Sequence, residues 1–286
     1  MLKQEFAAYD NFFFDFDGVI WEGEEALPGA PELVRTLQTL GKKVYFLSNN
    51  TTRTRESFTE KLGQLGIETT PTQVLSTSYS VACFLQSKYP AGTKVFTIGL
   101  FGLPEEVSKA GFTVVNSLDM MEETVTSSED YLRMPIDPEV KVVIVGFTPL
   151  LNYYMIGYAV RCVQNGAELI AGNVDKYDKV GEFNIPSSGC TVAAIEVCTG
   201  AKASTVGKPD PYMLRLATER DHLDSHKSIV FGDKMDTDIL LAKNYGVASV
   251  LMLTGVDSRA TAAVYTYQPD FILGSLFDVM QGRDKL

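Results

Sequence analysis

Two aspartates, Asp15 and Asp17, come directly after a run of three consecutive phenylalanines, Phe12–Phe14. Such a run predicts a central strand whose two faces are both covered. Residues two apart in a strand point to the same side, so both carboxylates would face one space at the carboxyl end of the sheet. Open α/β sheets bind their ligands at that edge. The pair is a candidate for catalysis, although a strand-to-turn junction in which one aspartate caps a helix would give the same spacing.

Two further segments carry groups that could bind a phosphoryl group. A second buried strand, Val44–Leu47, ends in Ser48, Asn49 and Asn50. The Ser48 hydroxyl and the backbone amides near Asn49 could bind phosphoryl oxygens without adding charge, but a turn that caps the next helix explains these residues equally well. Lys208 stands in the sequence Gly-Lys-Pro, where the proline cannot continue a strand and presents the ammonium group at a turn. Lys208 is therefore either a phosphate-binding group or a surface lysine.

A third buried strand, Ser228–Phe231, is followed by Asp233 and, five residues later, by Asp238, where a helix should begin. Asp238 could simply complement the helix dipole. A carboxylate at the buried end of a core strand, as at Asp233, requires a cation. Together with Asp15 and Asp17 these groups form a set of hard oxygen ligands without His or Cys. Such a set favours Mg²⁺, and a phosphoryl group would supply a further oxygen.

The four segments DFDGV, SNN, GKP and GDKMDTD occur in this order and resemble the motifs of the haloacid dehalogenase superfamily of aspartyl-phosphate phosphatases. The chain from about Tyr9 to Val256 is similar to the branch that contains 4-nitrophenylphosphatase, phosphoglycolate phosphatase and pyridoxal phosphate phosphatase. This resemblance implies a Mg²⁺-dependent phosphatase that hydrolyses small-molecule phosphate monoesters. The alternatives are a phosphotransferase or mutase that uses the same aspartate, and a non-catalytic, receiver-like phosphate-binding protein.

The resemblance also implies a role for each motif residue. Asp15 would be the nucleophile that forms an aspartyl-phosphate, and Asp17 would be the acid for the leaving alcohol and then the base for water. Mg²⁺ would be held by the Asp15 carboxylate, the Asp17 backbone carbonyl and Asp233. Asp238 would contact these ligands without binding the ion itself. The residues that would hold the phosphoryl group are Ser48, Asn49, Asn50 and Lys208.

The middle third of the chain contains a candidate for substrate selection. The segment Gly172–Asp178 resembles the loop that this branch turns toward the leaving group. Tyr177 would then pack on the substrate, and Asp178 would repel a leaving group that carries its own carboxylate. We therefore expect neutral or cationic phosphomonoesters to be preferred over phosphoglycolate; an ordinary exposed loop is the alternative. Pro186–Gly189 departs from the Pro-Gly-x-Gly of this branch, which predicts a local difference in the crossing back to the core.

Short β-branched or aromatic runs alternate with helical patterns, which predicts an α/β fold with a parallel sheet. The family implies a Rossmann-like parallel-sheet core with an inserted α/β cap that often forms a homodimer. We expect the core at residues 1–79 and 184–286 and the cap at residues 80–183. The expected strands are Asn11–Phe16, Lys43–Ser48, Gln73–Ser76, Lys94–Ile98, Val140–Phe147, Glu168–Ala171, Ser228–Phe231, Ala248–Leu253 and Phe271–Leu273. The expected helices are Pro31–Leu40, Thr54–Leu65, Ser80–Lys88, Thr191–Thr199, Tyr212–Arg220 and Thr237–Tyr245, with another that begins near Pro149.

The composition limits the partners and the location. Lysine and arginine number 25 against 36 aspartates and glutamates, a net charge of −11, so we expect neither nucleic acid nor an anionic membrane as a partner. Two histidines are too few for histidine-nucleophile phosphatases or zinc hydrolases. The uncharged stretch Val142–Val160 is interrupted by glycine, proline and asparagine, which argues against a membrane span. Four cysteines without a CxxC pair predict reduced, mostly buried thiols of a cytoplasmic protein.

Overall fold

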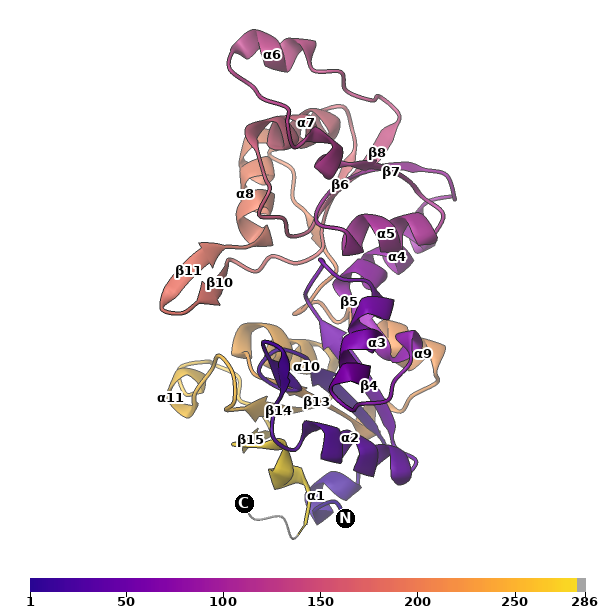
Figure 1. The fold of residues 1–286 in the computed structure, drawn as a ribbon, viewed down its shortest axis with the longest axis vertical. Helices are drawn as coiled ribbons and strands as arrows, with labels where there is room; N and C mark the ends of the chain where they lie inside the picture. The colour runs from indigo at the N-terminus through magenta and orange to yellow at the C-terminus, as the bar shows by residue number, and fades with distance from the viewer. Residues whose placement is uncertain (282–286) are drawn as a thin grey trace. The chain divides into compact units, whose positions relative to one another are not determined.

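The computed structural model describes residues 1–281, without the side chains of residues 179 and 180. The chain divides into two compact units (Figure 1). Unit 1 comprises Met1–Ser48, Arg55–Leu75 and the described chain from Lys208 onward, and unit 2 comprises Asn49–Thr54 and Ser76–Gly207. Each unit contains a sheet and helices, so the predicted α/β class is confirmed. Within the described residues, no helix combines the length and apolar character needed to cross a membrane.

Unit 1 is built on a six-stranded sheet with the strand order β15-β14-β13-β1-β4-β5. The registered pairs β1–β13, β1–β4, β13–β14 and β14–β15 are parallel. The chain runs outward from β1 through β4 to β5 and later returns at β13, on the other side of β1. Ligands of open α/β sheets bind where the strand order reverses in this way, which here is the carboxyl end of β1 and β13. The strands are β1 (Asn11–Asp15), β4 (Lys43–Ser48), β5 (Val74–Ser76), β13 (Ser228–Gly232), β14 (Ala248–Met252) and β15 (Phe271–Leu273).

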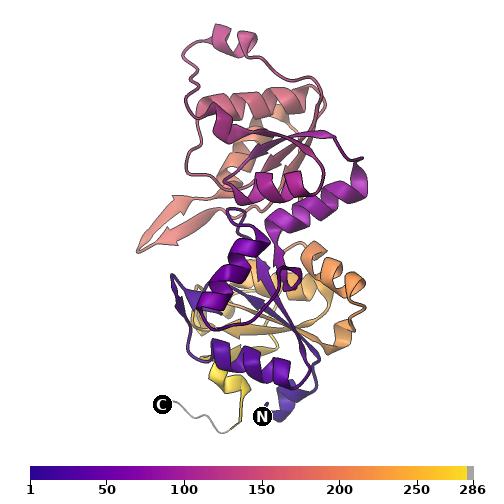
Figure 2. The same ribbon diagram turned by 45° about the vertical axis from the view of Figure 1, so that its right-hand side comes forward.

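The phenylalanines of β1 are buried on both faces of this sheet, as their sequence predicts. Phe12 and Phe14 pack in one cluster with Leu33 and Leu37 of α2 and with Phe58 of α3. In Figure 2, α2 and α3 lie in front of the sheet. Full burial of one such side chain contributes on the order of 2 kcal/mol. The helices of unit 1 are α1 (Gln4–Ala7), α2 (Ala30–Thr39), α3 (Arg55–Gln64), α9 (Tyr212–Arg220), α10 (Leu240–Tyr245) and α11 (Arg259–Ala262).

Short elements complete unit 1. A two-stranded antiparallel hairpin, β2 (Trp21–Glu22) and β3 (Glu25–Ala26), follows β1 directly. A π-helical turn, Met235–Ile239, connects β13 to α10. π-Helical turns interrupt regular helix geometry and occur frequently at functional sites. The 3₁₀ helices of the two units are Pro71–Gln73, Ser117–Met120, Ser225–Lys227 and Leu276–Val279.

Unit 2 has its own sheet, with the order β12-β9-β8-β6-β7 and parallel registered pairs, and a separate antiparallel hairpin, β10–β11. Its core includes Val143 and Val145 of β8, which pack with Tyr158 of α7 and Ile195 of α8. The strands are β6 (Lys94–Ile98), β7 (Thr113–Asn116), β8 (Val140–Val145), β9 (Glu168–Ala171), β10 (Tyr177–Val180), β11 (Phe183–Pro186) and β12 (Ser204–Thr205). The helices are α4 (Thr77–Lys88), α5 (Gly102–Lys109), α6 (Ser128–Arg133), α7 (Tyr153–Gln164) and α8 (Ser188–Thr199).

Unit 2 extends further than the segment 80–183 that we expect to form the cap. Residues 184–207 belong to it because Val192 and Ile195 of α8 pack in its core and β12 pairs with β9. The assignment of catalytic core and cap to the two units stays a prediction. The expectation of mostly buried thiols is wrong, since only Cys162 is buried among the four cysteines, and Cys190 and Cys198 are exposed.

Candidate active site

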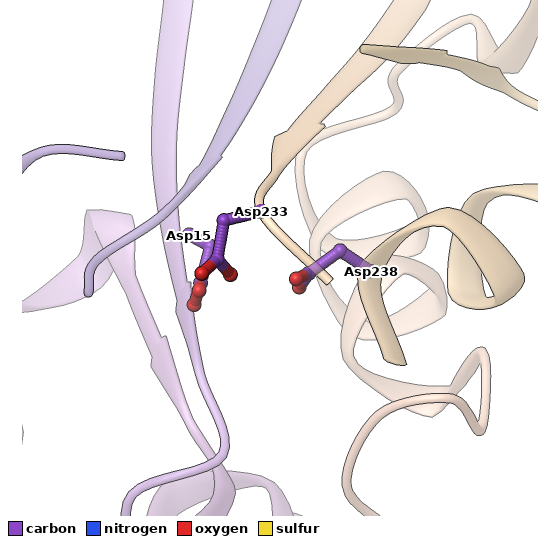
Figure 3. A group of neighbouring side chains, drawn as sticks. All are labelled: Asp15, Asp233 and Asp238. Carbon is purple, nitrogen blue, oxygen red and sulfur yellow. The ribbon is translucent and has the colours of Figure 1, made fainter. Parts of the chain in front are cut away.

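Three carboxylates that lie far apart in the sequence meet at the carboxyl end of the unit 1 sheet. Asp15 ends β1, Asp233 follows β13, and Asp238 belongs to the π-helical turn Met235–Ile239. One oxygen atom from each lies within 4.8 Å of the others, and all three residues are buried. In Figure 3 the Asp238 carboxylate points toward those of Asp15 and Asp233. The sequence prediction that β1 and β13 deliver acidic groups to one place agrees with this geometry.

Two glycines allow the chain to approach these carboxylates closely. A Cβ atom on Gly232 would lie 2.0 Å from the Cβ of Asp238, so any side chain there would displace the turn. Gly18 has φ +74°, and a Cβ on it would lie 2.6 Å from Asp233 Oδ2. A side chain at either position would therefore push an aspartate away from the cluster.

Lys208 provides the positive charge of the cluster. Its Nζ donates to Asp15 Oδ1 and to Asp238 Oδ1, each at 2.7 Å, and only 3% of its side chain is exposed. The interpretation of Lys208 as a surface lysine is therefore wrong. Three carboxylates and one ammonium group leave an excess of two negative charges in a buried place. A divalent cation would neutralise this excess, and carboxylate oxygens are the ligands that Mg²⁺ takes, so the residues present fit that ion.

The pKa values of the clustered side chains are shifted by the same excess of negative charge. Burial raises the pKa of Asp15 well above its ordinary value, and the charges of Asp238 and Asp233 add to this effect while Lys208 opposes it. Burial, together with the charge of Asp238, raises the pKa of Asp233 to about 7. Burial alone would lower the pKa of Lys208, but the charges of Asp15 and Asp238 raise it. Lys208 therefore stays a cation, and Asp15 and Asp233 hold their protons to higher pH than an ordinary aspartate unless another positive charge is added.

Asp17 lies apart from the three clustered carboxylates. Strand β1 ends at Asp15, so the alternation of side chains that we used to place Asp17 does not extend to it. Asp17 is exposed, and its Oδ1 accepts a hydrogen bond from the indole Nε1 of Trp21 at 2.8 Å. The roles of Asp17 as acid, base and carbonyl ligand stay predictions.

The three residues of the Ser-Asn-Asn segment each have different structural partners. Ser48 ends β4 and is buried, one residue beyond the pair formed by Asp15 and Leu47. The Asn49 backbone carbonyl accepts from Asn173 Nδ2 at 2.7 Å. Asn50 Oδ1 accepts from the Thr52 amide and hydroxyl at 2.6 and 2.7 Å, which is a local turn. Phosphate binding by Ser48, Asn49 and Asn50 stays a prediction.

Tyr177 and Asp178 are the first two residues of strand β10. They pair with Pro186 and Ile185 of β11, and both are exposed. The sequence suggested a loop for the segment that ends at Asp178, and its last two residues instead begin a hairpin. Substrate selection by Tyr177 and Asp178 stays a prediction.

One further segment of the site was missed from the sequence. The residues after β14 contact the cluster: the Thr254 hydroxyl donates to the Gly18 carbonyl at 2.6 Å, and the Val256 amide donates to Asp233 Oδ2 at 2.7 Å. Asp257 Oδ2 in turn accepts from the Met235 amide at 2.7 Å. The available signal was topological, because β14 neighbours β13 in a parallel sheet and its carboxyl end must lie at the same edge.

Comparisons with known proteins identify the family of this chain. A family model described as haloacid dehalogenase-like hydrolase matches residues 12–113, and a related hydrolase-like model matches residues 205–279. Phosphoglycolate phosphatase 2 of Arabidopsis thaliana is 32% identical over 286 residues, which cover 98% of this chain and 95% of that protein. The chain belongs to the haloacid dehalogenase-like hydrolases. The resemblance noted from the four motifs is thereby confirmed.

Two solved structures place this hydrolase within the family. The p-nitrophenyl phosphatase from Archaeoglobus fulgidus matches with a TM-score of 0.82 and 32% identity, over 94% of this chain and 97% of that one. A glycerol phosphate phosphatase from Mycobacterium tuberculosis, in complex with magnesium, matches with a TM-score of 0.81 and 25% identity, over 98% and 79% of the two chains. Each of these relatives carries the name of a phosphatase.

Proposed function

We propose that this hydrolase is a Mg²⁺-dependent phosphatase that cleaves small-molecule phosphate monoesters through an aspartyl-phosphate on Asp15. The observation that carries the proposal is the buried cluster of Asp15, Asp233 and Asp238, in which the Lys208 ammonium pairs with Asp15 and Asp238. Preorganised cations stabilise the charge of a transferring phosphoryl group, and the Lys208 ammonium lies 2.7 Å from Asp15 Oδ1. The phosphatase names of the relatives support the same reaction class.

The proposed reaction has two steps. In the first, an Asp15 carboxylate oxygen attacks phosphorus, the bond from phosphorus to the ester oxygen breaks, and Asp17 gives its proton to the leaving alcohol. In the second, Asp17 takes a proton from a water molecule, whose oxygen attacks the same phosphorus. The bond between phosphorus and Asp15 then breaks, which releases inorganic phosphate and restores both aspartates.

The remaining residues position the phosphoryl group and balance its charge. Lys208 and Ser48 would hold the phosphoryl oxygens, together with Asn49 and Asn50 of the segment that follows. Asp15, Asp233 and the Asp17 carbonyl would hold Mg²⁺, with Asp238 beside them. Bound there, Mg²⁺ would neutralise negative charge on the phosphoryl oxygens. Positioning and charge neutralisation are the main contributions that a protein makes to phosphoryl transfer.

The test is the release of inorganic phosphate from 4-nitrophenyl phosphate by the purified protein. We expect turnover with Mg²⁺, its loss in EDTA, and its recovery when Mg²⁺ is restored in excess. Asp15→Asn should lower kcat by about 10⁴-fold or more, as removal of one member of a catalytic unit does. Full activity in EDTA or in Asp15→Asn would exclude the proposal.

The same assay separates the alternatives. A phosphotransferase or mutase would form a phosphorylated product in preference to free phosphate when an alcohol or sugar phosphate acceptor is added. A receiver-like protein would accumulate phosphate on Asp15 and release less than about one phosphate per protein in the time of many expected turnovers.

The substrate, the location and the oligomeric state are also part of the proposal. We propose that the substrate is a metabolite-sized, neutral or cationic phosphomonoester, with Tyr177 and Asp178 selecting the leaving group. We also propose a cytoplasmic protein that forms a homodimer through unit 2. Sedimentation of the protein over a range of concentrations tests the dimer, and a fluorescent fusion expressed in the source cells tests the location.

A further inference from the structure

Trp21, which follows the first motif, is in direct contact with Asp17. It is the only tryptophan in the 286-residue sequence, and it is 2% exposed. Its Nε1 donates to Asp17 Oδ1 at 2.8 Å, and the two residues also form an isolated β-bridge. A buried donor therefore holds an exposed carboxylate from one side.

The indole ring is itself fixed by its neighbours. It stacks on Phe16 with ring centroids 4.2 Å apart and an angle of 8° between the planes, and Phe58 also stacks on Phe16, with centroids 4.8 Å apart. The Lys61 ammonium lies 4.5 Å from the Trp21 ring and donates to the Gly23 carbonyl at 2.6 Å. A stacked, clamped ring loses little further freedom when it donates a hydrogen bond, so the position of its N–H is preorganised.

The chemistry of this donor suits the orientation of a carboxyl group. An indole N–H only donates, and it carries no charge. Its hydrogen bond fixes one of the two carboxyl oxygens and leaves the other available for the reaction. Lys208, which holds Asp15, is by contrast a charged donor. The two aspartates of the first motif are thus held by partners of different kinds.

We infer that Trp21 is a positioning residue that orients the Asp17 carboxyl during both steps of the reaction. With Oδ1 bound to the indole, Oδ2 is the oxygen that gives the proton to the leaving alcohol and later takes one from water. This inference rests on the proposed acid and base roles of Asp17. It assigns a function to a residue that lies outside the four motifs.

The test compares two esters that differ in their need for a proton. 4-Nitrophenolate leaves without much protonation, whereas the alkoxide of glycerol phosphate requires it. The constant kcat/KM reports the steps up to departure of the alcohol. In Trp21→Phe, which keeps an aromatic ring and loses the N–H, we expect kcat/KM for glycerol phosphate to fall about tenfold and that for 4-nitrophenyl phosphate less than about threefold.

Two further variants distinguish the loss of the N–H from a general loss of stability. Because Trp21 is the only tryptophan, growth of a tryptophan auxotroph on 3-benzothienylalanine replaces the indole N–H by sulfur at this one position. This replacement keeps the size of the ring and should reproduce the unequal loss. Phe58→Leu is the matched control, since it loosens the same aromatic stack and leaves the N–H in place. It should lower the unfolding midpoint without changing the ratio of the two kcat/KM values.

Asp17→Asn separates a failure of this inference from a failure of the proposed function. Equal losses on both esters in Asp17→Asn would remove the acid role of Asp17 and the inference with it. If Asp17→Asn discriminates between the esters and neither tryptophan replacement does, the positioning role alone is wrong. If both discriminate, Trp21→Phe added to Asp17→Asn should cause no further unequal loss, because the group that it positions is already absent.

Discussion

At the residue scale, Lys208 has two roles. It pairs with the proposed nucleophile, Asp15, and it holds the buried carboxylates of Asp15 and Asp238 together. Its Nζ lies 2.7 Å from oxygens of both Asp15 and Asp238, and burial deprives all three side chains of water. Removal of one partner from a buried ion pair leaves an uncompensated charge, which is more costly than the loss of an exposed pair.

Lys208→Met should therefore affect both activity and stability. We expect kcat to fall by about 10²-fold or more, since a charged group aimed at the reacting phosphoryl is lost. In EDTA near neutral pH we expect the free energy of unfolding to fall by about 3–5 kcal/mol. Urea unfolding followed by Trp21 fluorescence measures the second effect, because Trp21 lies in unit 1.

Lys227→Met is the matched control for this substitution. Lys227 also lies in unit 1 and pairs with Asp10 at 3.1 Å, but both side chains are about half exposed. An exposed pair contributes less than about 1 kcal/mol, so this variant should remain active and nearly as stable as the unmodified protein. Equal behaviour of the two variants would contradict the assignment of Lys208.

At the scale of elements, the strand ends were the most predictable part of the site. Buried apolar runs gave β1, β4 and β13, and parallel strands bring their carboxyl ends to one edge, so the meeting of Asp15 with Asp233 followed from the sequence. Asp17 was less predictable, because a turn after β1 ends the alternation on which its placement depended.

Two other parts of the structure could not be predicted from the types of their residues. The Val256 contact with Asp233 uses a backbone amide, which any residue except proline supplies. The hairpin β10–β11 carries exposed side chains wherever they are described, so it shows no alternation of buried and exposed residues from which a strand could be inferred.

The same hairpin carries the prediction on substrate choice. Asp178→Ala should raise kcat/KM for phosphoglycolate by up to about tenfold, or roughly 1.4 kcal/mol, because a repelling charge is removed. The constant for 4-nitrophenyl phosphate should stay nearly unchanged. Asp178 is exposed, so the substitution should have little effect on folding. Steady-state kinetics on the two esters measures both expectations.

Glu182→Ala provides the control within that hairpin. Glu182 is an exposed acid in the turn between β10 and β11, and its removal changes the net charge by the same amount. An equal gain in both variants would mean that total charge, rather than the position of Asp178, determines the discrimination. Phosphoglycolate as the best substrate of the unmodified enzyme would also contradict this prediction.

At the scale of the whole molecule, the buried acids couple folding to pH and to the metal. Burial raises the pKa of Asp233 to about 7, and it raises the pKa of Asp15 as well. Between the ordinary value of an aspartate and these raised values, the folded protein binds more protons than the unfolded chain. Stability without metal must therefore fall as pH rises through this window, and it is greatest on the acidic side. Acids with lowered pKa values, such as Asp10 and Asp221, lose their contribution only at lower pH.

We therefore expect the protein in EDTA to be less stable at about pH 8 than at about pH 5.5, by on the order of a few kcal/mol. Mg²⁺ should stabilise it more at the higher pH, because fewer protons compete for the carboxylates there. Asp233→Asn, which cannot ionise, should reduce both the loss of stability with pH and the effect of Mg²⁺. Urea unfolding at the two pH values, with and without Mg²⁺, measures all of these quantities through Trp21 fluorescence. A metal-free protein that is equally stable at both pH values would show that the three carboxylates do not carry the excess charge on which the metal site depends.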